Sequence, residues 1–171
     1  MSSHSMSAGN VKLRELILLA LMGALMMATQ VALAALPNIH LVAVFIILAA
    51  QLFAWKSLFS IYIFVLLEGL IYGFSMWFIN YLYVWAVLDV VCVLLRKNKS
   101  CVFWAAVAGI FGAMFGALCS IPYFFIGGWK AAFSYWIAGI LFDVIHCVSN
   151  AAIVLVLLTP LRKTCERFMR N

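Results

Sequence analysis

Three of the five acidic residues in this chain lie in the middle of long apolar segments. They are Glu68, Asp89 and Asp143, whereas nearly all Lys and Arg residues lie in short polar stretches or near the chain ends. A carboxylate in hydrocarbon costs about 2.5 to 3.5 kcal/mol on insertion scales, so intramembrane acids usually face protein, water or a ligand. The three acids therefore predict that the protein encloses a polar interior.

A polar stripe marks the last apolar segment, where Asp143, His146, Cys147 and Asn150 follow at i, i+3, i+4 and i+7. Residues at these spacings share one face of a helix. Asp143 and His146 can pair directly, and the stripe must face protein, water or ligand. Two interpretations stay open, a substrate-binding site and a buried hydrogen-bonded staple between helices.

Aromatic rings accompany the other two acids. Tyr72 lies one turn outward from Glu68, and Tyr81, Trp85 and Asp89 share a helix face. If this segment is a helix with a rise of 1.5 Å per residue, Asp89 lies about 12 Å deeper in the membrane than Tyr81. Rings above carboxylates suit a flat or cationic ligand, stacked by the rings and neutralised or hydrogen-bonded below.

The expected outer end of the protein is rich in aromatic residues. Eight of the Trp and Tyr residues lie there: Trp77, Tyr81, Tyr83, Trp85, Tyr123, Trp129, Tyr135 and Trp136. An ordinary aromatic belt decorates both membrane interfaces, so the asymmetry favours an outward-facing cup. His40 and Gln30 are further candidates for ligand contact, although a single His at an interface is often just solvated.

No signature of catalysis or metal binding is present. The sequence has no GxSxG, HExxH or P-loop motif, and His40 and His146 each lack a second His at ligand spacing. The five cysteines form no CxxC pair. We therefore expect no enzyme activity, cofactor or metal, and any uphill transport must draw its energy from an ion or a partner.

The composition indicates which elements position these residues. With 68% apolar and 9% charged residues, the chain is predicted to be an all-α integral membrane protein with six transmembrane helices. The segments are 13–36, 39–55, 57–78, 81–95, 101–125 and 131–158. Six spans place every basic residue except Lys130 on one side, so both termini are expected to be cytoplasmic. The net charge of +6 then reflects topology and gives little support for nucleic-acid binding.

The predicted organisation is a single membrane domain with two polar ends. Residues 1–10 are expected to be a disordered cytoplasmic tail, 11–160 the transmembrane substrate-binding domain, and 161–171 a basic cytoplasmic tail. Turns are predicted at Pro37-Asn38, Asn80, 96–100 and Gly127-Gly128.

Small residues form stripes on two of the predicted helices. Ala20, Ala24 and Ala28 share one face of the first helix, and Gly112 and Gly116 share one face of the fifth. Such stripes let another helix backbone approach closely. Packing inside the bundle is favoured for the fifth helix, whereas the first helix suits either internal packing or docking onto a partner.

These features together resemble the substrate-binding S component of an energy-coupling factor (ECF) transporter. The resemblance rests on six short-looped helices with both ends inside, the Ala20-x-x-x-Ala24-x-x-x-Ala28 element and the aromatic outer end. It implies an S-component-like bundle in a prokaryotic cell membrane that binds a vitamin-like substrate near its outer face. It also implies docking, through Ala20, Ala24 and Ala28, onto a transmembrane scaffold subunit driven by two ATPases.

The intramembrane acids, with no compensating Lys or Arg, disfavour an anionic substrate. A cationic or amide-rich heterocycle fits better, such as thiamine, its pyrimidine or a queuine-like base. Two other classes stay open: a proton-coupled carrier in which Glu68 or Asp143 titrates, and a structural membrane subunit with no ligand.

Overall fold

The computed structural model describes residues 8–170, and this part of the chain is folded into helices without strands. The helices are α1 (Ala8–Ala32), α2 (Val42–Phe53), α3 (Ser57–Tyr72), α4 (Met76–Leu95), α5 (Cys101–Cys119) and α6 (Ile121–Arg170), with a short 3-10 helix, η1 (Ala54–Lys56), before α3. Five helical segments of this part are long and apolar enough to cross a membrane. The chain thus has the architecture of a multi-pass membrane protein.

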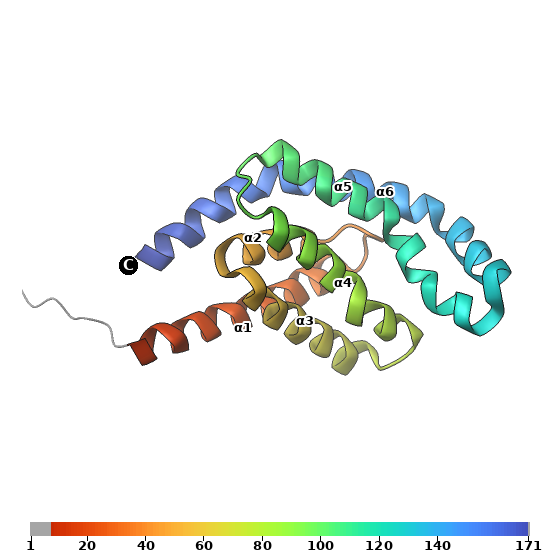
Figure 1. The fold of residues 1–171 in the computed structure, drawn as a ribbon, viewed down its shortest axis with the longest axis horizontal. Coiled ribbons are helices and arrows are strands. Elements are labelled where there is room, and N and C mark those ends of the chain that lie inside the picture. The colour runs from red at the N-terminus through yellow and green to blue at the C-terminus, as the bar shows by residue number, and fades with distance from the viewer. Residues whose placement is uncertain (1–7, 171) are drawn as a thin grey trace, which may run out of the picture.

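Successive helices run in alternating directions along the long axis of the molecule (Figure 1). α5 and α6 form a long antiparallel pair on one side, and α1, α3 and α4 lie on the other side. α2 lies between them, and its residues 42–51 are all buried. At about 18 Å, α2 is shorter than a hydrocarbon core of about 30 Å, and a helix that is apolar all round suits this central place.

Close backbone contact joins α1 to α3. The Ser60 hydroxyl donates a hydrogen bond to the carbonyl oxygen of Leu19 at 2.7 Å. A Cβ on Gly23 would lie 2.6 Å from the Ser60 carbonyl oxygen, so only glycine permits this approach. Ala24 and Ala28 are exposed, so they take no part in this contact.

Glycines also bring α5 and α6 together. A Cβ on Gly112 would lie 2.7 Å from backbone atoms of His146 and Cys147, and one on Gly116 would lie 2.5 Å from the Asp143 carboxylate. The prediction that the small residues of the fifth helix serve internal packing is confirmed. This contact fixes the position of the polar stripe of α6 along the axis of α5.

Two boundaries differ from the sequence-based expectation. α1 ends at Ala32, so the connection to α2 is residues 33–41 and is longer than predicted. Pro37 lies within this connection, where it cannot extend a helix and disfavours helical geometry in the residue before it. The turn expected at Asn80 is wrong: Asn80 is buried inside α4 and accepts a hydrogen bond from the Tyr83 hydroxyl at 3.3 Å. Gly73, with φ of +83°, makes the turn instead.

The ends of the domain are more helical than expected. Residues 1–7 of the predicted disordered tail lie outside the described residues, but Ala8 already begins α1. α6 bends at Gly127 and Gly128, as predicted, and then continues through most of the basic tail to Arg170. Arg14 donates a hydrogen bond to the Phe168 carbonyl oxygen at 2.8 Å, so the start of α1 and the end of α6 lie together.

Basic residues gather at this same end of the molecule. They come from the start of α1, from η1, from the 96–100 connection and from the end of α6, which all lie toward the left in Figure 1. Lys56 of η1 forms an ion pair with Glu15 at 2.6 Å. Lys130 belongs to the opposite end, just after the bend in α6.

Candidate functional site

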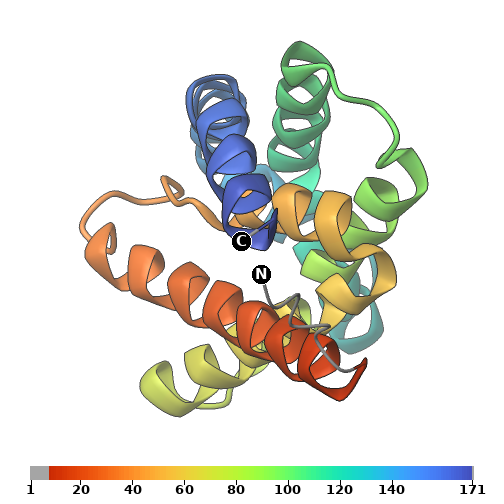
Figure 2. The same ribbon diagram turned by 90° about the vertical axis from the view of Figure 1, so that its left-hand side faces the viewer.

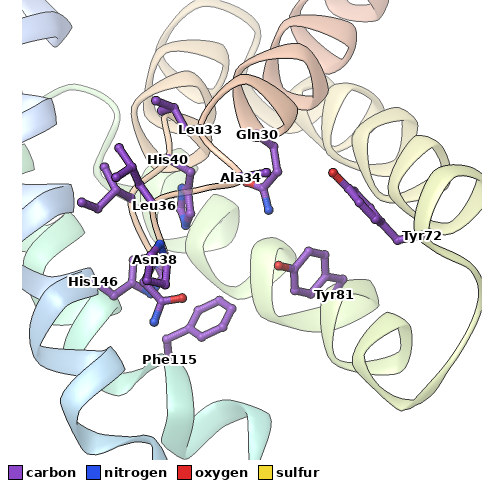
Figure 3. Close-up of a pocket in the computed structure, with 12 residues that line it drawn as sticks. Gln30, Leu33, Ala34, Leu36, Asn38, His40, Tyr72, Tyr81, Phe115 and His146 are labelled. Atoms are coloured by element: carbon purple, nitrogen blue, oxygen red, sulfur yellow. The ribbon is translucent and has the colours of Figure 1, made fainter.

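A cavity of about 240 Å³ opens between the 33–41 connection and the helices around it (Figure 3). Its polar and aromatic lining residues are Gln30, Asn38, His40, Tyr72, Tyr81, Phe115 and His146. They come from α1, the connection, α3, α4, α5 and α6, so the cavity forms only in the assembled bundle. Five of the residues named as candidates for ligand contact are brought together here: Gln30, His40, Tyr72, Tyr81 and His146.

The 33–41 connection is held in place by Asn38. Its side-chain amide donates to the Phe142 carbonyl oxygen at 3.0 Å, and its own carbonyl oxygen accepts from the Ser149 hydroxyl at 2.8 Å. Asn38 has a φ of +57°, in the left-handed region that Asn tolerates better than most residues. Both contacts tie the connection to α6 and thereby position His40 over the cavity.

Two imidazoles meet in the cavity wall. The ring centroids of His40 and His146 lie 4.8 Å apart at an interplanar angle of 74°. Both side chains are buried, and within the described residues neither ring nitrogen of His146 nor Nδ1 of His40 has a hydrogen-bond partner. Burial lowers the pKa of His40 to about 4, so this imidazole is neutral at pH 7.

Aromatic rings pack around this pair. The Phe115 ring lies 4.7 Å from His146, and the Trp85 ring lies 5.5 Å from both His40 and Tyr81. Trp85 is fully buried and does not line the cavity, so it supports the lining from behind. Tight packing of this kind holds the lining side chains in fixed positions.

Glu68 and Asp89 do not line this cavity. Glu68 is buried near Tyr81, close enough for an electrostatic interaction, and its Oε1 has no hydrogen-bond partner. Asp89 lies one helical turn inward from Trp85, fully buried, and neither of its carboxylate oxygens makes a geometrically adequate hydrogen bond. The two acids are therefore enclosed by protein, outside the cavity.

The polar stripe of α6 divides into two kinds of residue. The Gly116 backbone amide donates to Asp143 Oδ1 at 2.8 Å, and the Asn150 amide donates to the Ala108 carbonyl oxygen at 3.4 Å. These two side chains link α6 to α5. Of the predicted stripe, only His146 lines the 240 Å³ cavity. Asp143 also lines a neighbouring, mainly apolar cavity of about 400 Å³, and its Oδ2 makes no geometrically adequate hydrogen bond within the described residues.

The outer aromatic residues are dispersed rather than gathered in one cup. Tyr123 and Tyr135, which lie in α6 on either side of its bend, stack on each other at 4.2 Å, and Trp129 just after the bend is 70% exposed. The Tyr83 hydroxyl donates a hydrogen bond mainly to the Leu118 carbonyl oxygen at 2.6 Å, shared with the more distant Asn80 Oδ1 at 3.3 Å. Of the eight residues, Tyr81 alone lines the cavity.

Sequence reasoning missed Asn38 and Phe115 as parts of the site. Asn38 follows Pro37, a pair that predicts a turn, and that signal gave no hint of the contacts to α6. Phe115 is one of many apolar residues in its segment, so no local pattern sets it apart. Only the packing of α5 against α6 brings its ring to His146.

The described residues contain no group of three or more His, Cys, Asp or Glu side chains that could hold a metal ion. No known protein family, curated protein or solved structure matches the chain. The function of the protein must therefore be inferred from the geometry of its cavity and from the surface of the bundle.

Proposed function

We propose that this protein is a membrane-embedded substrate-binding component of the ECF type, which captures a small vitamin-like compound in the 240 Å³ cavity. The observation that carries the proposal is the pair of buried imidazoles, which have unpartnered ring nitrogens and belong to the wall of a cavity with an aromatic lining. Unpaired buried polar groups cost about 1 to 3 kcal/mol each, and a bound ligand would remove that cost.

The proposed topology has six crossings with both termini in the cytoplasm of a prokaryotic cell. The alternating helix directions support six crossings, with the short α2 shielded in the centre. The clustering of basic residues at one end supports its placement on the cytoplasmic side. The cavity, which lies by the 33–41 connection, then belongs to the outer half of the bundle.

The proposed docking surface is the small-residue face of α1, formed by Ala20, Ala24 and Ala28. Ala24 and Ala28 are exposed and Ala20 is half-buried, while Gly23, on another face, contacts α3. Exposed small side chains let a partner helix approach the α1 backbone closely. The partner in this proposal is a transmembrane scaffold subunit that two cytoplasmic ATPases drive.

Bulky substitutions on this face test the docking role. We expect Ala24→Trp and Ala28→Trp to abolish co-purification of the scaffold and ATPase subunits, because an indole prevents close helix contact. Retention of small molecules by the purified protein should not change, since neither residue lines the cavity. The matched control is Ala106→Trp, at an exposed alanine on α5. Partner recovery equal to that of the control would contradict the proposed docking surface.

A proton-coupled carrier is the second candidate. It is favoured by the unpartnered carboxylate oxygens of Glu68 and Asp143, which lie in membrane-spanning segments without a basic partner at those atoms. A carrier moves its substrate alone in vesicles with a pH gradient, whereas a binding component requires the scaffold and ATPases. Vesicle transport by the isolated protein therefore separates the two candidates.

A further inference from the structure

The cavity lining carries no formal charge. Figure 3 draws the 12 lining residues, and none of them is Asp, Glu, Lys or Arg. Its polar groups are two carboxamides, two phenols and two imidazoles. A charged ligand in this cavity would lose its hydration without gaining a counterion from the lining, which is unfavourable in a buried site.

The unpartnered polar atoms of the cavity lining include both hydrogen-bond donors and hydrogen-bond acceptors. His146 is 1% exposed and neither of its ring nitrogens has a partner, so a neutral ring offers one donor and one acceptor. Gln30 adds an unpartnered carbonyl oxygen, which can only accept. An ammonium group only donates and a carboxylate only accepts, so neither satisfies this set. A ligand edge with both donors and acceptors does.

The shape of the lining favours a flat ligand. The Phe115 and Tyr81 rings border the cavity together with the two imidazoles, and the Gln30 side chain lies within reach of the Tyr81 hydroxyl (Figure 3). The volume of about 240 Å³ is just below the roughly 300 to 1,000 Å³ of typical small-molecule pockets. A compound of one or two rings suits both the size and the aromatic walls.

We infer that the cavity selects an uncharged, flat heterocycle whose edge carries both hydrogen-bond donors and acceptors, and that it rejects cationic and anionic compounds with the same ring. The inference rests on the proposed binding function and narrows its substrate class. The sequence predicted either a cationic or an amide-rich heterocycle. The structure favours the amide-rich heterocycle, because Glu68, the acid near Tyr81, lies outside the cavity lining.

Matched compounds test this inference on the full-length protein in lipid nanodiscs at pH 7.5. Each set shares a pyridine or a pyrimidine ring and differs in charge: nicotinamide, nicotinate and 1-methylnicotinamide; hydroxymethylpyrimidine, orotate and thiamine. The small-molecule fraction of yeast extract is added as a third sample. Compounds that stay with the protein through gel filtration are released and quantified by mass spectrometry.

The expected result is retention of a neutral compound at least tenfold above its charged counterparts. His146→Phe should reduce this retention at least tenfold, and Gln30→Leu provides a second variant if the first does not fold. Glu68→Gln should change it less than threefold. Equal or stronger retention of a charged compound, or a tenfold loss in Glu68→Gln, would overturn the inference but leave the binding function intact. No retention from any sample would instead refute the binding function itself.

Discussion

The chemistry of the site depends on a few side chains that are buried without partners. His40 and His146 lie edge to face in the cavity wall with free ring nitrogens, while the Asp143 and Asn150 side chains are engaged with α5. The sequence marked all four as candidates for ligand contact, three of them on the polar stripe and His40 as a weaker one. At the scale of single residues, the imidazoles are the groups available to a ligand.

The neutral state of His40 leads to a prediction about pH. Its pKa is lowered from 6.5 to about 4 by burial, so in any opened or unfolded state the ring binds a proton more readily than in the folded state. The contribution of His40 to stability is therefore fully present above about pH 6.5 and is lost as the pH falls toward 4. The loss is at most about 3 kcal/mol.

Thermal unfolding of the protein in nanodiscs between pH 7.5 and 5 measures this effect. Wild type should lose stability more steeply than His40→Asn, because the variant has no imidazole to protonate at this position. Parallel curves for the two proteins would show that His40 is already protonated or that water reaches it in the folded state.

At the scale of elements, the antiparallel pair of α5 and α6 supplies Phe115 and His146 to the cavity, and α6 holds the 33–41 connection through Asn38. Gly112 and Gly116 allow the contact, the Asp143 carboxylate is bonded to the backbone of α5, and the pair brings Phe115 to His146. A change in the spacing of these helices would therefore move two walls of the cavity.

Gly112→Ala tests the close contact between the two helices. The new Cβ would meet the His146 carbonyl oxygen and the Cys147 nitrogen at 2.7 Å, and backbone atoms cannot turn aside as a flexible side chain can. We expect a loss of about 1 to 3 kcal/mol in the free energy of unfolding, measured by detergent titration. Gly139→Ala is the control, because nothing lies within 4 Å of its Cβ. Equal stability of the two variants would mean that α5 and α6 separate without cost.

The helices and turns show which structural features local sequence patterns can predict. Hydropathy located the helices, and the glycine spacing on the fifth helix correctly predicted its packing, because both depend on local composition. The turn placed at Asn80 was wrong because Asn80 is buried inside α4, and its burial depends on the helices packed around it rather than on the local sequence. The role of Asn38 in holding the connection depends on Phe142 and Ser149, more than 100 residues away. Such long-range contacts are not readable from the sequence.

At the scale of the whole molecule, two surfaces have different expected roles. The cavity lies by the 33–41 connection, and the exposed alanines of α1 lie on the outside of the bundle. The central α2 contacts both halves of the structure and is almost entirely buried. This separation is what a binding component needs, because it must hold a substrate and dock on a partner at the same time.

The central claim is that the isolated protein binds a small molecule but does not transport it. The most direct measurement reconstitutes the purified protein into lipid vesicles, with and without a pH gradient, and supplies the small-molecule fraction of yeast extract. Compounds bound to the protein and compounds inside the vesicles are then quantified separately by mass spectrometry. We predict a compound retained at about one per protein in wild type and lost in His146→Phe, with no accumulation inside the vesicles under either condition. Accumulation driven by the pH gradient, or the absence of any retained compound, would contradict the claim.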